Sequence, residues 1–236
     1  MTYSIIVRDP STGTLGAAVA SRFFAVGAMC IHVEGGVAAL STQALVNPMY
    51  AVYAMPHLRM GEPADAVLAS LVGPDPGADQ RQFHIIDAAG RIAQHTGSNC
   101  VTWAGHVRGQ DVSVAGNMLA GPAVVQRMVE AWLGSSGSIA ERLINALEAG
   151  EAAGGDKRGK QSAGLKVCTR DPFPDLDIRA DDHADPLAEL RRLHRVSLER
   201  FAVFRRFVPG SDSPWGALDR AVIDAAIARD RVPPTG

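Results

Sequence analysis

The residue best suited to take part in a reaction is Thr2, which directly follows the initiator methionine. Methionine is normally removed when the second residue is small, so we expect a mature chain in which Thr2 carries both a free hydroxyl and a free α-amine. Such an amine has a pKa of about 7.7 to 8.0, so it is partly neutral near pH 7 and can accept the proton of a nearby hydroxyl. Many chains begin with Met-Thr by chance, and support for a catalytic interpretation must therefore come from the rest of the sequence.

Polar residues beside glycines form a second group of candidates. Asn117 follows Gly116, where its amide would either stabilise an oxyanion or only form a turn. Asp156, Arg158 and Lys160 occupy a glycine-flanked loop, which is typical of a solvated linker but also lets the backbone approach a ligand closely. In the second case Arg158 or Lys160 would pair with a substrate carboxylate, and Asp156 would hold an α-ammonium in place.

Further candidates for the wall of a binding pocket are Arg22, Gln43 and Gln161. His106 lies close to Trp103, a combination suited to binding a flat ligand. A lone histidine beside a tryptophan is also typical of structural packing, so both interpretations of His106 stay open.

One acidic segment contains residue types that bind metals, namely Asp181, Asp182 and His183. Because no second cluster of such residues lies elsewhere in the sequence, a solvated loop that caps the next helix is the better interpretation. No glycine-rich segment has the spacing of a phosphate-binding loop. We therefore expect neither a metal nor a cofactor.

Composition restricts the class of protein further. The chain has 236 residues, of which 47% are hydrophobic, and this is enough for a sizeable core. A net charge of −2 provides no basic surface for nucleic acid, so we expect a small-molecule substrate. Three cysteines lie far apart and are expected to be reduced core residues. With no leader and no run of about 20 apolar residues, we expect a cytoplasmic protein without a membrane segment.

The elements that must position the candidate residues follow from periodicity and turn formers. Two β-rich runs, residues 2–8 and 14–20, flank a cluster of turn-forming residues and predict a hairpin. The second run is apolar on both faces, which indicates a central strand covered on each side. Further strands are expected at residues 28–33, 36–41, 82–87, 91–95, 101–106, 112–115 and 165–169.

Helical periodicity and helix-start residues predict helices at residues 48–59, 63–72, 121–133, 138–149, 186–207 and 215–228. Up to Asp171 the order is strands, two helices, strands, two helices and a strand, which suits two sheets stacked face to face between two helix layers. After Asp171 the composition changes to prolines and acids. We therefore expect a domain over residues 1–171 and a helical extension over residues 172–236. The extension would pack on this domain or on a neighbouring subunit of a homodimer or higher homo-oligomer.

Several motifs resemble those of known families. The hairpin that begins at Thr2, the strand exit at residues 15–22 and the strand-to-helix step at residues 39–44 resemble the N-terminal nucleophile (Ntn) hydrolases, particularly proteasome β subunits. The whole sequence is still more similar to an uncharacterised bacterial family, the domain of unknown function 1028. That similarity extends over about residues 2–205. Its motifs lie at residues 103–106, 116–122 and 154–163. The resemblance implies an α+β fold, a four-layer αββα sandwich of the Ntn-hydrolase type with a C-terminal helical extension.

The resemblance to proteasome subunits also suggests roles for single residues. Ser21 falls where those enzymes place an aspartate near the nucleophile, and Asn117 falls near their Gly-Ser step. Asp156 and Ser162 fall near their closing Asp-Ser-Gly-Gly segment. The implied catalytic residues are thus Thr2, Asn117, Asp156 and Ser162, with Ser21 in the wall of the substrate site.

Two positions depart from the proteasome pattern. Ser21 lacks the negative charge of the aspartate, and Glu34 stands where a lysine assists the threonine of proteasomes. Other Ntn hydrolases work without that lysine and stabilise the oxyanion with asparagine and backbone amides, so Asn117 is the better candidate here. We therefore expect an N-terminal threonine amidohydrolase that cleaves a small amide, imide, ureido compound or short peptide through an acyl-enzyme. The alternative is a non-catalytic ligand-binding or assembly protein that retains Met1 and so blocks the amine.

Overall fold

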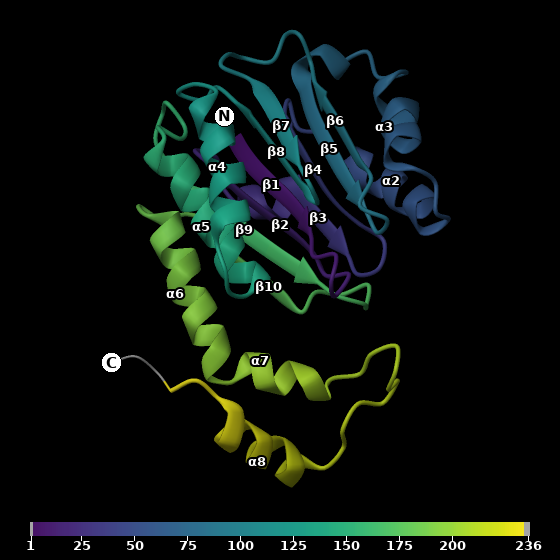
Figure 1. Ribbon diagram of the computed structural model, residues 1–236, viewed down its shortest axis with the longest axis vertical. Coiled ribbons are helices and arrows are strands. Elements are labelled where there is room, and N and C mark those ends of the chain that lie inside the picture. Colours follow the sequence, from purple (N-terminus) through teal and green to yellow (C-terminus); the bar gives the residue numbers. More distant parts are fainter. Residues whose placement is uncertain (1, 234–236) are drawn as a thin grey trace.

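The computed structural model describes residues 2–233 and has a mixed α/β architecture with two antiparallel sheets (Figure 1). The six-stranded sheet has the order β10-β9-β2-β1-β8-β7, and the four-stranded sheet has the order β3-β4-β5-β6. The strands are β1 (Thr2–Arg8), β2 (Leu15–Ser21), β3 (Ile31–Glu34), β4 (Ala38–Ala44), β5 (Arg81–Asp87), β6 (Ile92–Thr96), β7 (Gly105–Gly109), β8 (Val112–Asn117), β9 (Ser162–Cys168) and β10 (Leu176–Ala180). The α-helices are α1 (Val26–Cys30), α2 (Met49–Arg59), α3 (Ala64–Val72), α4 (Ala123–Gly134), α5 (Ile139–Ala152), α6 (Pro186–Glu199), α7 (Phe201–Phe204) and α8 (Arg220–Asp230).

The hairpin of β1 and β2 forms the centre of the larger sheet, as the sequence predicts. Its turn is closed by a hydrogen bond from Asp9 N to Thr14 O of 2.8 Å, and Gly13 adopts a φ of 74°, which favours glycine. All seven residues of β2 are buried, because β1 and β9 pair with its two edges and side chains cover both faces. The small residues of this strand therefore suit its central position.

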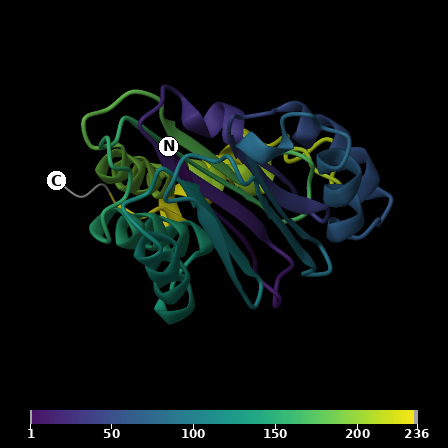
Figure 2. The ribbon, with the colours of Figure 1, turned by 90° about the horizontal axis from the view of Figure 1, so that it is seen from above.

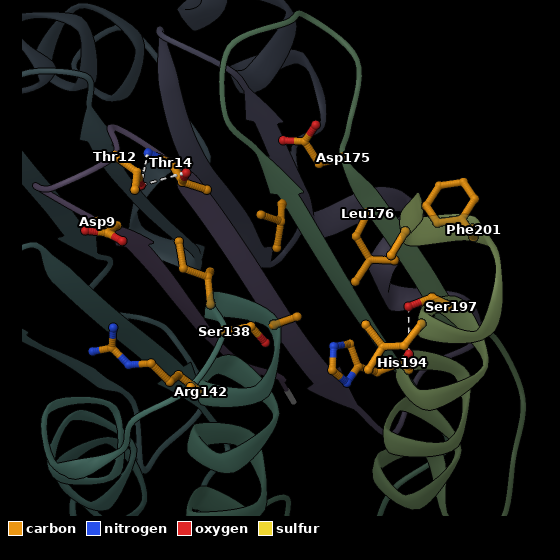
Figure 3. Close-up of a pocket in the computed structure, with 16 residues that line it drawn as sticks. Asp9, Thr12, Thr14, Ser138, Arg142, Asp175, Leu176, His194, Ser197 and Phe201 are labelled. Carbon is orange, nitrogen blue, oxygen red and sulfur yellow. Dashed lines mark hydrogen bonds between the residues drawn. The ribbon is translucent and has the colours of Figure 1, made fainter. Parts of the chain in front are cut away.

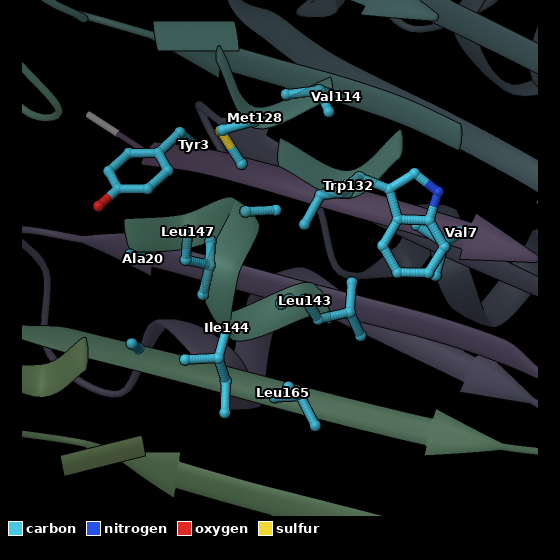
Figure 4. Close-up of a cluster of buried hydrophobic side chains, with 14 of the residues drawn as sticks. Tyr3, Val7, Ala20, Val114, Met128, Trp132, Leu143, Ile144, Leu147 and Leu165 are labelled. Atoms are coloured by element: carbon cyan, nitrogen blue, oxygen red, sulfur yellow. The ribbon is translucent and has the colours of Figure 1, made fainter. Parts of the chain in front are cut away.

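Helices α4 and α5 cover the outer face of the six-stranded sheet. Helix α5 begins with a capping box in which Ser138 and Glu141 satisfy each other's backbone amides. Apolar side chains of the helix pair, such as Met128, Trp132 and Leu143, pack on strand residues in one buried cluster (Figure 4). This packing buries the face of the six-stranded sheet that lies toward α4 and α5.

A second apolar layer lies between the two sheets, and a third lies under α2 and α3. Ile6 and Val19 of the larger sheet pack with Ile31 and Ile86 of the smaller one. The outer face of the smaller sheet is covered by α2 and α3, whose buried residues pack around Phe83. Figure 2 shows the strands in the middle, with the teal and green helices on one side and the blue helices on the other.

Two expected strands are wrong at their start. Residues 28–30 belong to α1 rather than to a strand, because Gly27 packs closely against Gly164 of β9 and holds this turn of helix against the sheet. The strand expected at residues 101–106 begins only at Gly105. In the preceding segment, the carbonyls of Val101 and Trp103 accept hydrogen bonds from the loop after β8 and are not available for strand pairing.

The chain after residue 171 is more closely joined to the sheet than its composition predicts. Strand β10, which the sequence did not predict, pairs with β9 along residues 176–180, and Leu187 and Leu190 of α6 belong to the core cluster beneath α5. The long helix expected at residues 186–207 breaks at Arg200, where φ is −148°. Beyond this break, Val203 of α7 packs with α8 in a small separate cluster. Figure 1 shows α7 and α8 at the bottom of the view, below the sheets.

Candidate functional site

Strand register brings Thr2 together with three candidate residues that are far apart in the sequence. Thr2 is the first residue of β1 and pairs with Ser21 of β2 on one side and with Asn117 of β8 on the other. Ser21 in turn pairs with Ser162 of β9. These four residues therefore form a row across one end of the six-stranded sheet.

The hydroxyl of Thr2 borders a small cavity. Thr2 Oγ1 lies 3.1 Å from Ser21 Oγ, within hydrogen-bond distance. The cavity has a volume of about 80 Å³, and Gln43 and Arg158 also line it. The remaining lining side chains are mainly apolar and comprise Phe23, Val26, Met29, Cys30, Ala44 and Val46. The cavity thus combines the hydroxyls of Thr2 and Ser21 with other polar groups and an apolar wall.

Helix α1 provides much of that apolar wall because it approaches the sheet very closely. A Cβ atom added to Gly164 would lie 2.7 Å from Gly27 Cα, a distance that side chains do not tolerate. Burial raises the pKa of the Cys30 thiol to about 12, so this neighbour stays protonated and is a poor nucleophile. Thr2 and Ser21 therefore provide the hydroxyl groups of this cavity.

A chain of side-chain amides connects Thr2 to Asn117. Gln43 Nε2 lies 3.5 Å from Thr2 O and donates to Gln82 Oε1 at 2.9 Å. Gln82 Oε1 also accepts a hydrogen bond of 3.0 Å from Asn117 Nδ2. The opposite side of the Gln82 amide donates to Gly116 O at 2.7 Å, which defines its orientation. Because Gln82 is fully buried, this amide fixes the direction in which the Asn117 side chain points.

A second branch of the network extends between the two sheets. Gln43 Oε1 accepts a hydrogen bond from Ser4 Oγ at 2.6 Å, and Ser4 Oγ lies 2.9 Å from His84 Nε2. His84 Nδ1 lies 2.7 Å from Ser113 Oγ. Burial lowers the pKa of His84 to about 3, so its ring is neutral near pH 7. Ser4, His84 and Ser113 therefore form an uncharged hydrogen-bond network that holds the Gln43 side chain on the side away from the cavity.

The loop over Ser21 and Arg22 is held by Asp156. Its buried carboxylate accepts hydrogen bonds from Arg22 N at 3.0 Å and from Arg158 N at 2.7 Å. Arg158 Nη2 also lies 3.2 Å from Asp156 Oδ2, and Arg22 Nη1 donates to Arg158 O at 2.6 Å. Asp156 and Arg22 thus hold Arg158 at the edge of the Thr2 cavity.

The structure also shows where the remaining predicted site residues lie. The hydroxyl of Ser162 donates to Phe23 O and accepts from Val26 N, so it holds the turn before α1 and does not line the Thr2 cavity. Lys160 pairs with Asp185 at 3.1 Å. Gln161 Nε2 donates to Asp182 Oδ1 at 3.2 Å. These side chains join the loop to the segment before α6.

His106 lies outside this group. It is on β7, two strands from Thr2, and its Nδ1 lies 2.8 Å from Thr96 Oγ1. Thr96 also accepts a hydrogen bond from Gln82, so His106 contacts the buried network at its outer end. His106 does not line the Thr2 cavity.

Sequence reasoning missed the residues that position the site from within, namely Ser4, Gln82, His84 and Ser113. A signal was present, since Gln82 and His84 alternate with apolar residues in a strand that is buried on both faces. Polar side chains at such positions require partners inside the protein. Their partners, however, come from the other sheet and cannot be read from local sequence.

Two negative findings apply to residues 2–233. No group of three or more histidine, cysteine, aspartate or glutamate side chains there has an arrangement that could hold a metal ion. Within the same residues, no helix combines the length and apolar character needed to cross a lipid bilayer.

Comparison with known proteins identifies the family. A model described as "Family of unknown function (DUF1028)" matches residues 2–190, which is most of the chain. The chain belongs to the DUF1028 family. This DUF1028 protein is similar to the crystal structure of protein SPO2555 from Silicibacter pomeroyi, also described as DUF1028, with 30% identity and a TM-score of 0.86. That similarity covers 93% of this chain and 96% of the other.

A more distant likeness links the DUF1028 protein to Anbu (ancestral beta-subunit) from Yersinia bercovieri. The identity is 13% and the TM-score is 0.42, over 88% of this chain and 98% of the other. This likeness is too weak to support a functional conclusion. None of the curated proteins compared with this DUF1028 chain matches it. Family membership is therefore confirmed, while the resemblance to Ntn hydrolases stays a prediction.

Proposed function

We propose that this protein is an N-terminal threonine amidohydrolase of the Ntn type. It would cleave a small amide, imide, ureido compound or short peptide through an acyl-enzyme. The observation that carries the proposal is the position of Thr2, whose hydroxyl borders a cavity at the end of a central strand, between Ser21 and Asn117.

The arrangement of layers supports the proposal. Helices α4 and α5 pack on the outer face of the six-stranded sheet, and α2 and α3 pack on the outer face of the four-stranded sheet. Apolar side chains join the two sheets. This order of packing is the one expected of a four-layer αββα sandwich. Shared architecture does not by itself establish hydrolysis, so the site must support the function.

The proposed reaction begins after removal of Met1, which lies outside the described residues. Thr2 Oγ attacks the carbonyl carbon of the substrate, and its proton passes to the neutral α-amine of Thr2, directly or through one water. The amine then gives the proton to the leaving nitrogen as the C–N bond breaks, and an ester on Thr2 remains. Water hydrolyses this ester with the same amine as base, which restores the free hydroxyl.

Asn117 and Arg158 have complementary roles in this proposal. Asn117 lines the cavity next to that of Thr2, and Ala44 borders both. Its Nδ2 gives one of its two hydrogens to Gln82, and the second is proposed to stabilise the oxyanion. Arg158 lines the same cavity as Thr2 while its guanidinium is paired with Asp156, and it is proposed to bind a carboxylate of the substrate.

The departures from proteasomes are consistent with a different charge arrangement. Glu34 stands where proteasomes have a lysine, and it forms an ion pair with Arg59, whose Nε lies 2.6 Å from Glu34 Oε1. Ser21, in place of an aspartate, forms a neutral contact with Thr2. Under the proposal, the nucleophile is therefore assisted by neutral groups, since Arg158 at the edge of the cavity is paired with Asp156.

The test combines intact-mass spectrometry of protein from its native host with an electrophilic β-lactone probe. Loss of one methionine and a stoichiometric adduct on Thr2 would support the proposal. Thr2→Ala should remove the adduct without unfolding the protein, and Thr2→Ser, which keeps both the amine and a hydroxyl, should retain it. Retained Met1 with no adduct would contradict the proposal and favour a non-catalytic ligand-binding or assembly protein on the same fold.

A further inference from the structure

A second cavity lies at the opposite end of β1 from Thr2. Its volume is about 360 Å³, and Asp9, which directly follows β1, lines it (Figure 3). A strand of seven residues spans about 20 Å, so this cavity is separate from the Thr2 site. We refer to it as the C-terminal cavity because α6 and α7 form one of its walls.

The C-terminal cavity is enclosed by three parts of the fold. Val167 and Leu176 of the six-stranded sheet form its floor, and Ile139 at the start of α5 forms one wall. The opposite wall carries Leu198 of α6 and Phe201 of α7. Polar residues such as Thr12, Thr14 and Ser138 also line it. A cavity of a few hundred Å³ that combines apolar side chains with polar groups is typical of a small-molecule site.

His194 is the polar group that distinguishes this cavity from an ordinary packing gap. It is 5% exposed, and Figure 3 shows its ring extending from α6 toward α5. Among residues 2–233, its ring nitrogens make no hydrogen bond, although its backbone carbonyl accepts one from Ser197. Burial lowers the pKa of His194, and its neutral ring has one donor and one acceptor that it can offer to a ligand.

Charged groups at the edge of the cavity restrict the ligand further. Asp9 and Asp175 carry negative charge there and disfavour an anion. Arg142 stacks on Trp132 with its guanidinium carbon 3.7 Å from the ring centroid and donates from Nη2 to Trp132 O at 3.0 Å. Its buried Nε has no partner among the described residues, so it suits a ligand oxygen that accepts a hydrogen bond. The apolar floor offers no partner to a cation, and the Asp175 carboxylate at the edge is already paired with Arg205 Nη2 at 2.9 Å. The lining therefore favours a neutral ligand.

We propose that the C-terminal cavity binds a neutral single-ring aromatic molecule with one hydroxyl group, which pairs with His194. The ring would lie over Val167 and Leu176, beside the rings of Phe201 and His194, which favour offset or edge contacts with another ring. Binding would connect the sheet to α6 and α7. The segment after residue 185 would then act as a wall of a ligand site.

The experiment uses the full chain and two probes, para-cresol and toluene, which differ by one hydroxyl. Isothermal titration should show saturable binding of one para-cresol per chain, with a higher melting temperature in its presence. Toluene should bind on the order of 3- to 10-fold more weakly, the range expected for one hydrogen bond. His194→Phe, which removes the ring nitrogens, should reduce para-cresol affinity by a similar factor and leave toluene affinity unchanged.

A filling variant and a matched control locate the binding. Ala202→Trp places a large side chain at the cavity lining, whereas Ala188→Trp places one on an exposed position of α6 that does not line it. Only Ala202→Trp should abolish binding. Methyl NMR of the wild type gives a test that does not depend on variants, since para-cresol should shift the methyl signals of Ile139, Leu176 and Leu198. No saturable binding, or unchanged shifts at these methyls, would overturn the proposal.

Discussion

Gln82 offers the sharpest test of how the fold positions the Thr2 site. Its side-chain oxygen accepts hydrogen bonds from Gln43 at 2.9 Å and from Asn117 at 3.0 Å, and it is fully buried. Gln82→Leu keeps a similar volume but removes the acceptor of both amides. Each buried donor without a partner costs about 1–3 kcal/mol, so the free energy of unfolding should fall by about 2–6 kcal/mol. This is a large part of the roughly 5–15 kcal/mol that stabilises a typical domain.

Gln43 Nε2 keeps its 3.5 Å contact with Thr2 O in Gln82→Leu, whereas Gly116 O loses the hydrogen bond of 2.7 Å from Gln82 Nε2, so the two effects offset each other within that range. Gln82→Glu should be at least as destabilising as Gln82→Leu. Its second carboxylate oxygen would replace Nε2, which donates to Gly116 O at 2.7 Å and to Gly105 O at 3.1 Å. Two acceptors would then face each other in a buried position.

Urea unfolding, followed by tryptophan fluorescence, measures these changes provided that the slope of each transition is unchanged. The matched control is Gln126→Leu, on an exposed position of α4, which should change stability by less than about 0.5 kcal/mol. A loss for Gln82→Leu that equals the control value would show that the amide network does not stabilise the site, and the reasoning would be refuted.

Three further predictions concern burial, close packing and capping. Burial lowers the pKa of His84 from 6.5 to about 3, so on acidification the unfolded chain binds a proton at this histidine before the folded chain does. The free energy of unfolding should therefore fall by about 2 kcal/mol from pH 7 to pH 5. In His84→Gln, urea unfolding should show a smaller change in this free energy over the same pH range. Gly164→Ala should cost about 1–3 kcal/mol in urea unfolding because its Cβ would meet Gly27 Cα at 2.7 Å, whereas Gly121→Ala, with nothing within 4 Å, should not. Ser138→Ala should lower the melting temperature through a loss of about 1 kcal/mol at the start of α5, and an unchanged value would contradict the role of its capping box.

The sequence alone was sufficient for elements whose signals are local. The hairpin around Gly13, the central position of the apolar strand β2 and the start of α5 at Ser138 all follow from turn formers, apolar runs and capping residues. These signals act over a few residues, so they persist in any tertiary context. Thr2 and Asn117 were also selected from the sequence, and they are direct neighbours in register.

Other features were decided only by tertiary structure. Residues 28–30 are helical because Gly27 and Gly164, far apart in the chain, allow α1 to approach β9. Strand β10 pairs with β9 and so joins to the sheet a segment whose composition is typical of an extension.

The candidate site shows the same division. The sequence determined which residue types could react, because a hydroxyl, an amide and a guanidinium are properties of single residues. It did not determine that Ser162 holds a turn or that Arg158 rather than Lys160 lines the Thr2 cavity. Those outcomes depend on strand register and on hydrogen-bond partners from other strands and loops. Only the folded chain brings such distant groups within 3 Å of one another, and the cost of burying them unpaired then selects one arrangement.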